Sequence, residues 1–137
     1  MGDRGQVRLR YTDELNGNDI YIYTHWGALS MPSVVADALE RGRDRWHDPC
    51  YLNRIIFSEF IANDVMGETG FGICTEEHGD VWRIIEVDHA HNSVKIFEKT
   101  YDQPVDDWGT TARTFTWEVV EQLDYQSFID KYAQVYV

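Results

Sequence analysis

The sequence predicts a single α+β domain over residues 1–137, built on a largely antiparallel sheet. Two observations predict this class. Apolar and polar residues alternate near the N-terminus and again after residue 70, which is typical of strands. Between these regions lie two segments with helix start signals and a helical apolar stripe. The implied order is β-β-α-α-β-β-β-β-α: an N-terminal hairpin and a later meander, with two helices inserted and a C-terminal helix packed on one face.

The first two strands form the predicted hairpin. Apolar residues alternate with arginines over residues 7–11, and the alternation resumes over residues 20–24. Between them, Asn-Gly-Asn-Asp at 16–19 is a turn signal.

The two inserted helices are predicted from their end signals. Ser30 and Pro32 mark the start of the first helix, and Gly42 marks its end. Asp48 and Pro49 open the second helix. Its apolar residues cover about half of the circumference, which predicts the central buried helix of the domain.

The second half of the chain returns to period two. Strands are predicted at 71–75, at 81–87 and from residue 94, joined by polar turns at 75–80 and 88–92. These three strands are expected to form an antiparallel meander. The remaining predicted elements follow in order: a loop at 102–111, a strand at 115–119 and a terminal helix capped by Asp124.

The sequence is strongly acidic, with 24 Asp and Glu residues against 12 Lys and Arg and a net charge of −12. A chain of this charge repels phosphates, so we expect no direct nucleic-acid partner. Three explanations of the acidity stay open. They are salt adaptation, ordinary solubility, and presentation of acid to a basic protein that normally binds DNA, RNA or a nucleotide.

Cysteine usage and apolar run lengths predict the compartment. Cys50 and Cys74 form neither a disulfide framework nor a zinc motif, which suits a reducing cytoplasm. Residues 1–10 lack the apolar segment of a signal peptide, and no apolar run is long enough to span a membrane. We therefore expect a cytoplasmic protein with no membrane contact and no cofactor.

The predicted second strand ends in His25-Trp26-Gly27. Alternation places Tyr21, Tyr23 and His25 on one face, so Trp26 is expected to continue the core face and plug the end of the sheet. Two interpretations of His25 stay open: a structural role beside the tyrosines, or a binding or catalytic role. No serine, cysteine or carboxylate lies nearby in the sequence to complete a nucleophile–base pair.

Two further motifs point to possible ligands. Gly-Glu-Thr-Gly-Phe-Gly at 67–72 lacks the Gly-Lys-Ser/Thr ending of a phosphate loop, so a turn entering a strand is expected. Asp88, His89 and His91 carry metal-ligating groups, but they fall at a predicted hairpin turn where polar residues are ordinary. No metal is expected, and these three residues remain the alternative.

Glu59 is a candidate acid or base. It falls near the edge of the apolar stripe of the second helix, where a carboxylate must find a partner or shift its pKa. Arg83 is the candidate partner in an internal ion pair. The alternative is a catalytic role for Glu59.

The segment 40–48 is the basic patch of this acidic chain. It brings together Arg41, Arg43, Arg45 and Trp46, and arginine with tryptophan is typical of interface hot spots and of anion capture. The alternative is a solvated loop paired with local acids. We expect these four residues to contact a protein partner if the protein has one.

Two short motifs carry a resemblance. Residues 21–27 read Tyr-Ile-Tyr-Thr-His-Trp-Gly, and 87–96 form a Val-Asp hairpin. The chain is similar to small phage and prophage proteins with Tyr-x-His-Trp/Tyr-Asp-Gly and Val-Asp-x-Asp at these places. It lacks the Asp between Trp and Gly, and it has His-Ala-His in the hairpin. The resemblance implies a mobile-element origin, but no activity and no functional residues.

Two functions follow as hypotheses. The first is a non-enzymatic acidic intracellular binding protein, a phage-type modulator that occupies a basic host protein which binds nucleic acid or a nucleotide. The second is a small hydrolase or nucleotide-binding protein in which His25 acts with Glu59 or Asp88. The second hypothesis requires these side chains to converge in one pocket.

Overall fold

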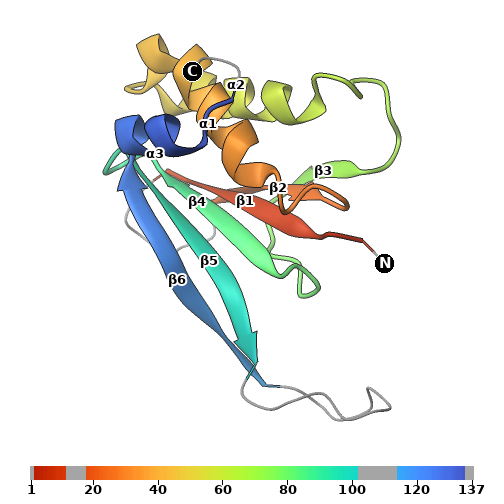
Figure 1. Ribbon diagram of the computed structural model, residues 1–137. Coiled ribbons are helices and arrows are strands. Elements are labelled where there is room, and N and C mark those ends of the chain that lie inside the picture. The colour runs from red at the N-terminus through yellow and green to blue at the C-terminus, as the bar shows by residue number, and fades with distance from the viewer. Residues whose placement is uncertain (1, 12–17, 102–113, 135–137) are drawn as a thin grey trace.

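The structure is a computed structural model that describes residues 2–11, 18–101 and 114–134 (Figure 1). Its element order confirms the predicted α+β class, with one short 3-10 turn (η1) added between the first two helices. The elements are β1 (Gly5–Arg10), β2 (Ile20–Thr24), α1 (Met31–Arg41), η1 (Arg43–Arg45), α2 (Pro49–Ile61), β3 (Phe71–Cys74), β4 (Arg83–Asp88), β5 (Ser93–Tyr101), β6 (Phe115–Asp124) and α3 (Tyr125–Tyr132). The predicted loop at 102–111 and residues 16 and 17 of the predicted turn lie outside the described residues.

The strands form one sheet with the order β3-β2-β1-β4-β5-β6. All neighbouring strands are antiparallel except β1 and β4, which are parallel. The three helices lie together on one face of this sheet, and the far ends of β5 and β6 extend beyond them (Figure 1). The sheet is therefore mostly antiparallel, as the sequence predicts.

The predicted meander of residues 71–75, 81–87 and 94 onward is wrong in one strand. Ile73 of β3 pairs with Ile22 of β2, so the meander consists of β4, β5 and β6. The connection from β3 to β4 explains the difference. It crosses the face without helices, where the Gln6 side chain bonds the Glu76 carbonyl oxygen at 3.2 Å and the His78 N–H at 2.9 Å. The connection thus passes over β2 and β1 before β4 begins.

The face without helices is polar at its centre. Glu86 of β4 is 1% exposed and accepts hydrogen bonds from Arg8 at 3.3 Å and Arg10 at 3.5 Å. Arg8 also donates to Glu77 of the crossing connection at 2.8 Å. Since buried charges need partners, this network explains why arginines alternate along β1.

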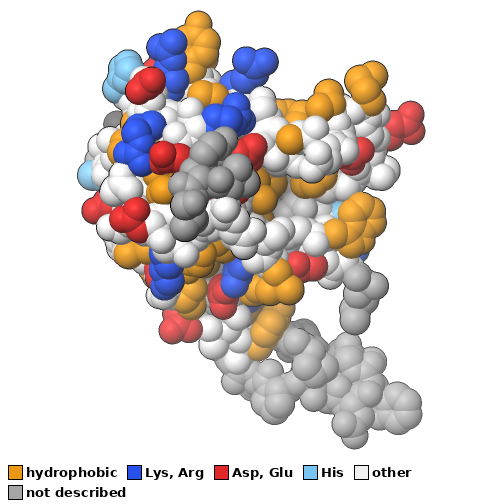
Figure 2. Space-filling model, turned by 45° about the horizontal axis from the view of Figure 1, so that its top comes forward, with side chains coloured by type: hydrophobic (Ala, Val, Ile, Leu, Met, Phe, Trp, Pro, Cys, Tyr) orange, Lys and Arg blue, Asp and Glu red, His pale blue; other side chains and the backbone are white. Residues whose placement is uncertain are grey.

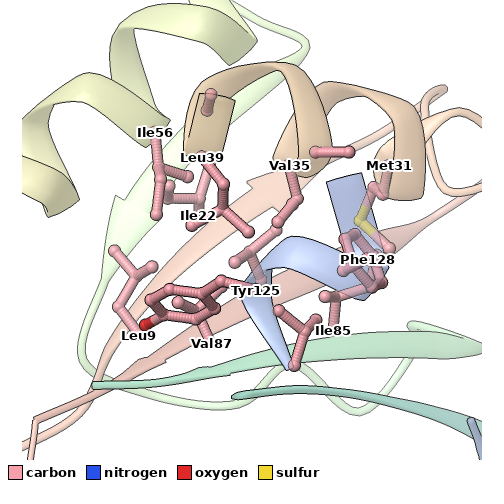
Figure 3. Packing of buried hydrophobic residues seen from close by; sticks show 14 of the residues in the cluster. Leu9, Ile22, Met31, Val35, Leu39, Ile56, Ile85, Val87, Tyr125 and Phe128 are labelled. Atoms are coloured by element: carbon pink, nitrogen blue, oxygen red, sulfur yellow. The ribbon is translucent and has the colours of Figure 1, made fainter. Parts of the chain in front are cut away.

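The core lies between the sheet and the helices (Figure 3). It is formed by apolar side chains from every helix and from the central strands, among them Leu9, Ile22, Val35, Leu39, Ile56, Ile85, Val87, Tyr125 and Phe128. The prediction that the second helix is the central one is wrong. In α1, seven of the residues are buried, against three in α2, because α1 packs against both α2 and α3.

Two of the predicted helix starts carry a side-chain cap, whereas Ser30, the N-cap of α1, makes no capping bond. The carboxylate of Asp48 accepts from the Tyr51 N–H at 3.4 Å, and that of Asp124 accepts from the Ser127 N–H at 2.7 Å. These bonds satisfy backbone donors that the first turn of a helix leaves free. Within the described ranges, none of the helices has the length and apolar character needed to cross a bilayer.

Candidate functional site

Two turns that are distant in the sequence meet at one corner of the sheet. The N–H of His25 donates to the carbonyl oxygen of Gly70 at 2.9 Å, which continues the β2–β3 ladder. Gly70 has a φ of +96°, a conformation that side chains rarely adopt. A Cβ at Gly70 would lie 3.2 Å from the Trp26 ring. The His25-Trp26-Gly27 and 67–72 motifs therefore form one structural unit.

Trp26 lies on the surface of this corner, and the prediction that it plugs the core is wrong. Its side chain is 64% exposed. Thr24, which is 1% exposed, occupies the last core-facing position, and the chain leaves the strand after it. The Trp26 ring stands edge-on to His25, with ring centroids 4.6 Å apart. An exposed tryptophan held between His25 and Gly70 has the side-chain type that is enriched in protein interfaces.

Tyr23 and His25 lie on one face, as alternation predicts. The Tyr23 hydroxyl is 3.1 Å from Nδ1 of His25, and the Tyr23 ring stacks on His78 at 4.7 Å. Burial raises the pKa of Tyr23, and the charge of Asp80 raises it further. The phenol therefore keeps its proton at neutral pH, and its hydroxyl forms a hydrogen bond with Nδ1 of His25.

The structure does not bring His25 together with either predicted carboxylate. The end of β2 that precedes His25 lies level with Arg83, whereas Asp88 is at the opposite end of β4, five residues and about 17 Å away. Glu59 lies on α2 and is 3.7 Å from Arg41. A shared His–carboxylate pocket is absent at these positions.

The proposed ion pair between Glu59 and Arg83 is also wrong. Arg83 points to the helix-covered face, where it donates to Glu98 at 2.6 Å and to the Ala28 carbonyl oxygen at 3.0 Å. Glu59 instead pairs with Arg41, and its side chain is 22% exposed. An ion pair does form at Glu59, but with a different arginine.

Arg43 and Trp46 of the basic patch are engaged inside the molecule. Arg43 donates to Gln126 of α3 at 2.7 Å and bonds Glu40, and its guanidinium lies 4.8 Å from the Trp46 ring centroid. The Trp46 indole N–H donates to the Leu39 carbonyl oxygen at 2.9 Å. These two side chains join α1 to α3.

Arg41 and Arg45 differ in their contacts with the rest of the protein. Arg41 donates to the Ile55 carbonyl oxygen at 3.0 Å, which ties α1 to α2. Arg45 is exposed and lies 5.1 Å from the ring centroid of Tyr51. Of the four predicted partner-binding residues, Arg45 is the one whose side chain forms no hydrogen bond or ion pair with a described residue.

The candidate metal residues diverge. His91 is exposed, with Nδ1 2.9 Å from Asp88, whereas His89 turns inward and its Nε2 lies 2.5 Å from Oδ1 of Asn53. Burial lowers the pKa of His89 to about 4, against the opposing effect of Asp88. In the part of the chain that the structure describes, no group of three or more His, Cys, Asp or Glu side chains is placed to hold a metal ion.

A cavity of about 390 Å³ lies between α1, α3, β5 and β6. Its four charged residues satisfy each other: Arg83 pairs with Glu98, and Lys131 pairs with Glu121. Since a ligand would have to break these pairs, the cavity is a weaker candidate than the Trp26 corner.

The charge distribution around the Trp26 corner is the signal that sequence reasoning missed. Residues 55–82 contain neither lysine nor arginine, although they contain six acids. Three of these carboxylates pair with arginines from other elements: Glu59 with Arg41, Glu77 with Arg8, and Asp80 with Arg4. The other three, Asp64, Glu68 and Glu76, are exposed and form no ion pair with any described residue.

Apolar side chains are exposed beside these carboxylates. Val65 is 64% exposed, Met66 89% and Ile73 56%. Hydrophobic side chains lie over the α2–β3 connection on the right of the molecule in Figure 2. Asp64 links this connection to the corner, because its Oδ2 would be 3.9 Å from a Cβ at Gly70. We call the exposed residues of this end the Trp26 surface: Trp26, Asp64, Val65, Met66, Glu68 and Ile73.

Comparison with known proteins found no match for the chain among protein-family models, curated proteins or solved structures.

Proposed function

We propose that the protein is a non-enzymatic acidic binding protein that docks a basic partner protein on the Trp26 surface. The observation that carries this proposal is the exposed Trp26, which is held against Gly70 next to the connection that carries Asp64 and Glu68, two carboxylates that form no ion pair with any described residue. Tryptophan is enriched among the residues that dominate binding energy at interfaces. Unpaired acids around it favour a basic partner and speed its association.

The separation of the candidate catalytic residues supports a binding function over the hydrolase alternative. General acid–base catalysis needs the base within hydrogen-bond reach of its partners. Nδ1 of His25 is hydrogen-bonded to the Tyr23 hydroxyl at 3.1 Å, and not to Glu59 or Asp88. Glu59 and Asp88 are engaged elsewhere, by Arg41 and His91.

The proposed docking depends on local complementarity and not on a row of carboxylates spaced like phosphates. Acidic and basic side chains are interspersed on the face in Figure 2. The partner's basic surface would therefore meet the apolar side chains and the two acids, Asp64 and Glu68, of the Trp26 surface. The same proposal includes the nature of the two proteins. The partner is a host protein that binds nucleic acid or a nucleotide, and this chain is a mobile-element modulator that meets it in the cytoplasm.

A pull-down with matched baits tests the proposal. The baits are the wild type, Trp26→Ala, Glu68→Lys and Arg45→Ala, each incubated with the same host lysate at low and high salt. We expect a basic protein that binds the wild type and Arg45→Ala, and that is lost with Trp26→Ala, with Glu68→Lys and at high salt. A partner that is lost only with Arg45→Ala would contradict the proposal and return the binding site to the basic patch.

A further inference from the structure

The outer edge of β3 offers free backbone groups to a partner. Paired residues in an antiparallel ladder alternate between hydrogen-bonded and non-hydrogen-bonded positions. The bond from His25 to Gly70 makes that pair a bonded one, so Gly72 and Cys74 also bond toward β2. The N–H and C=O groups of Phe71 and Ile73 therefore point away from the sheet. Since β3 is the last strand in the order, no described strand pairs with them.

We propose that a basic, extended segment of the partner protein adds as a further strand to the outer edge of β3. This inference rests on the proposed function, because it specifies how the basic partner docks. Strand addition uses main-chain hydrogen bonds for affinity and alternate side chains for specificity. Phe71 and Ile73 supply the main-chain groups, and the exposed side chain of Ile73 supplies an apolar contact.

The edge of β3 is short, but it lacks the other features that protect edge strands from pairing. Such strands usually carry lysine, proline, other charges or a bulge. The sequence of β3 is Phe-Gly-Ile-Cys, with none of these. The strand at the other end of the sheet, β6, carries Glu118 and Glu121 and pairs with β5 through an irregular register. The two edges therefore differ, and β3 is the one without charged side chains or an irregular register.

Charge selects a basic partner segment over a second copy of the chain. Asp64 and Glu68 lie in the connection that precedes β3, so the start of the edge carries carboxylates. A second copy of the chain, with the same net charge of −12, would be repelled by these acids. Lysine or arginine in a partner strand would instead meet opposite charge at this end. Trp26, beside the start of β3, also offers a ring face on which arginine can stack.

A peptide selection tests the class of partner. Short random peptides are displayed on ribosomes and captured by the immobilised wild-type protein. We expect enriched peptides with lysine or arginine alternating with β-branched residues. An enrichment without basic residues, or no enrichment at all, would overturn this inference, whereas the proposed function is tested separately by the pull-down.

Hydrogen exchange of the wild type with the most enriched peptide tests the mode of binding. The amides of Phe71 and Ile73 face solvent in the free protein, so they should exchange at least about tenfold more slowly when a strand covers them. The amides of Gly72 and Cys74 are already bonded to β2 and serve as internal controls. Unchanged exchange at Phe71 and Ile73, with binding still lost in Trp26→Ala, would overturn strand addition and leave the proposed function standing.

A pair of variants separates backbone from side chain at the edge. Ile73→Pro removes an N–H that makes no ladder bond, so the sheet should persist while peptide affinity falls by about tenfold. Ile73→Ala keeps the N–H and should lose less affinity. Equal binding by Ile73→Pro and the wild type would overturn the inference. So would a wild-type dimer, seen by light scattering, that Ile73→Pro abolishes, because the edge would then be filled by a second copy.

Discussion

The N–H of His25 donates to the carbonyl oxygen of Gly70, and this bond joins two turns that lie far apart in the sequence. It sets the register in which the backbone N–H and C=O groups of Phe71 and Ile73 point away from β2. It also brings Gly70 against Trp26. The exposure of Trp26 and the open edge of β3 are therefore consequences of the same contact. One corner of the sheet carries both parts of the proposed docking surface.

Replacement of Gly70 by alanine should destabilise the protein by about 1–2 kcal/mol. The φ of +96° is unfavourable for a residue with a Cβ, and that Cβ would lie 3.2 Å from the Trp26 ring. Urea unfolding followed by circular dichroism measures the loss. Gly79→Ala is the matched control, because a Cβ there meets nothing within 4 Å. Equal effects of the two substitutions would show that Gly70 is not strained by a side chain.

Local periodicity predicted the elements, because alternation and helical stripes are set by which side of each segment is buried. It did not predict the neighbours of β3, since the alternation at 71–75 is compatible with any adjacent strand. The β3 position depends on the connection that crosses the sheet through Gln6 and His78. Such a contact between distant residues has no signature in either segment alone.

The position of Trp26 was predicted wrongly for a related reason. Alternation was extended past Thr24, but the strand ends there, and the pattern no longer constrains the next side chains. The basic patch shows the opposite case. The sequence identified Arg43 and Trp46 as a group, and the structure places them together, but their contacts with Gln126 and Leu39 are internal. Composition finds such a cluster without indicating what its side chains contact.

Replacing each of two tryptophans should separate binding from stability. Trp26→Ala should change the free energy of unfolding by no more than about 0.5 kcal/mol, because the side chain is mostly exposed. Trp46→Ala should cost about 3 kcal/mol, since it removes the bond to Leu39 and the edge-on contact with Tyr125. Urea unfolding measures both values. A large loss in Trp26→Ala would mean that this tryptophan is structural and would weaken its role in docking.

Replacing each of two arginines of the basic patch should also have different effects on stability. Arg43→Ala should destabilise the protein by no more than about 1 kcal/mol, because Arg43 bonds Gln126 and stacks over Trp46 while remaining partly exposed. Arg45→Ala should have no measurable effect on stability, since Tyr51 is its exposed neighbour. Thermal unfolding of the two variants beside the wild type checks this order. A larger loss of stability in Arg45→Ala than in Arg43→Ala would contradict the role of Arg43 in joining α1 to α3.

Acidification should weaken the fold through His89. Its side chain is 8% exposed, between Asn53 and Tyr125, and burial lowers its pKa to about 4. The unfolded chain, with a histidine pKa of about 6.5, binds more protons in this window, so stability falls as the pH decreases from about 6.5 toward 4. Between about pH 7 and pH 5, the wild type should lose about 2 kcal/mol more than His89→Gln, because the variant lacks this histidine and otherwise has the same titratable groups. Urea unfolding at each pH measures the difference. Parallel pH profiles for the two proteins would show that His89 does not titrate as a buried neutral group.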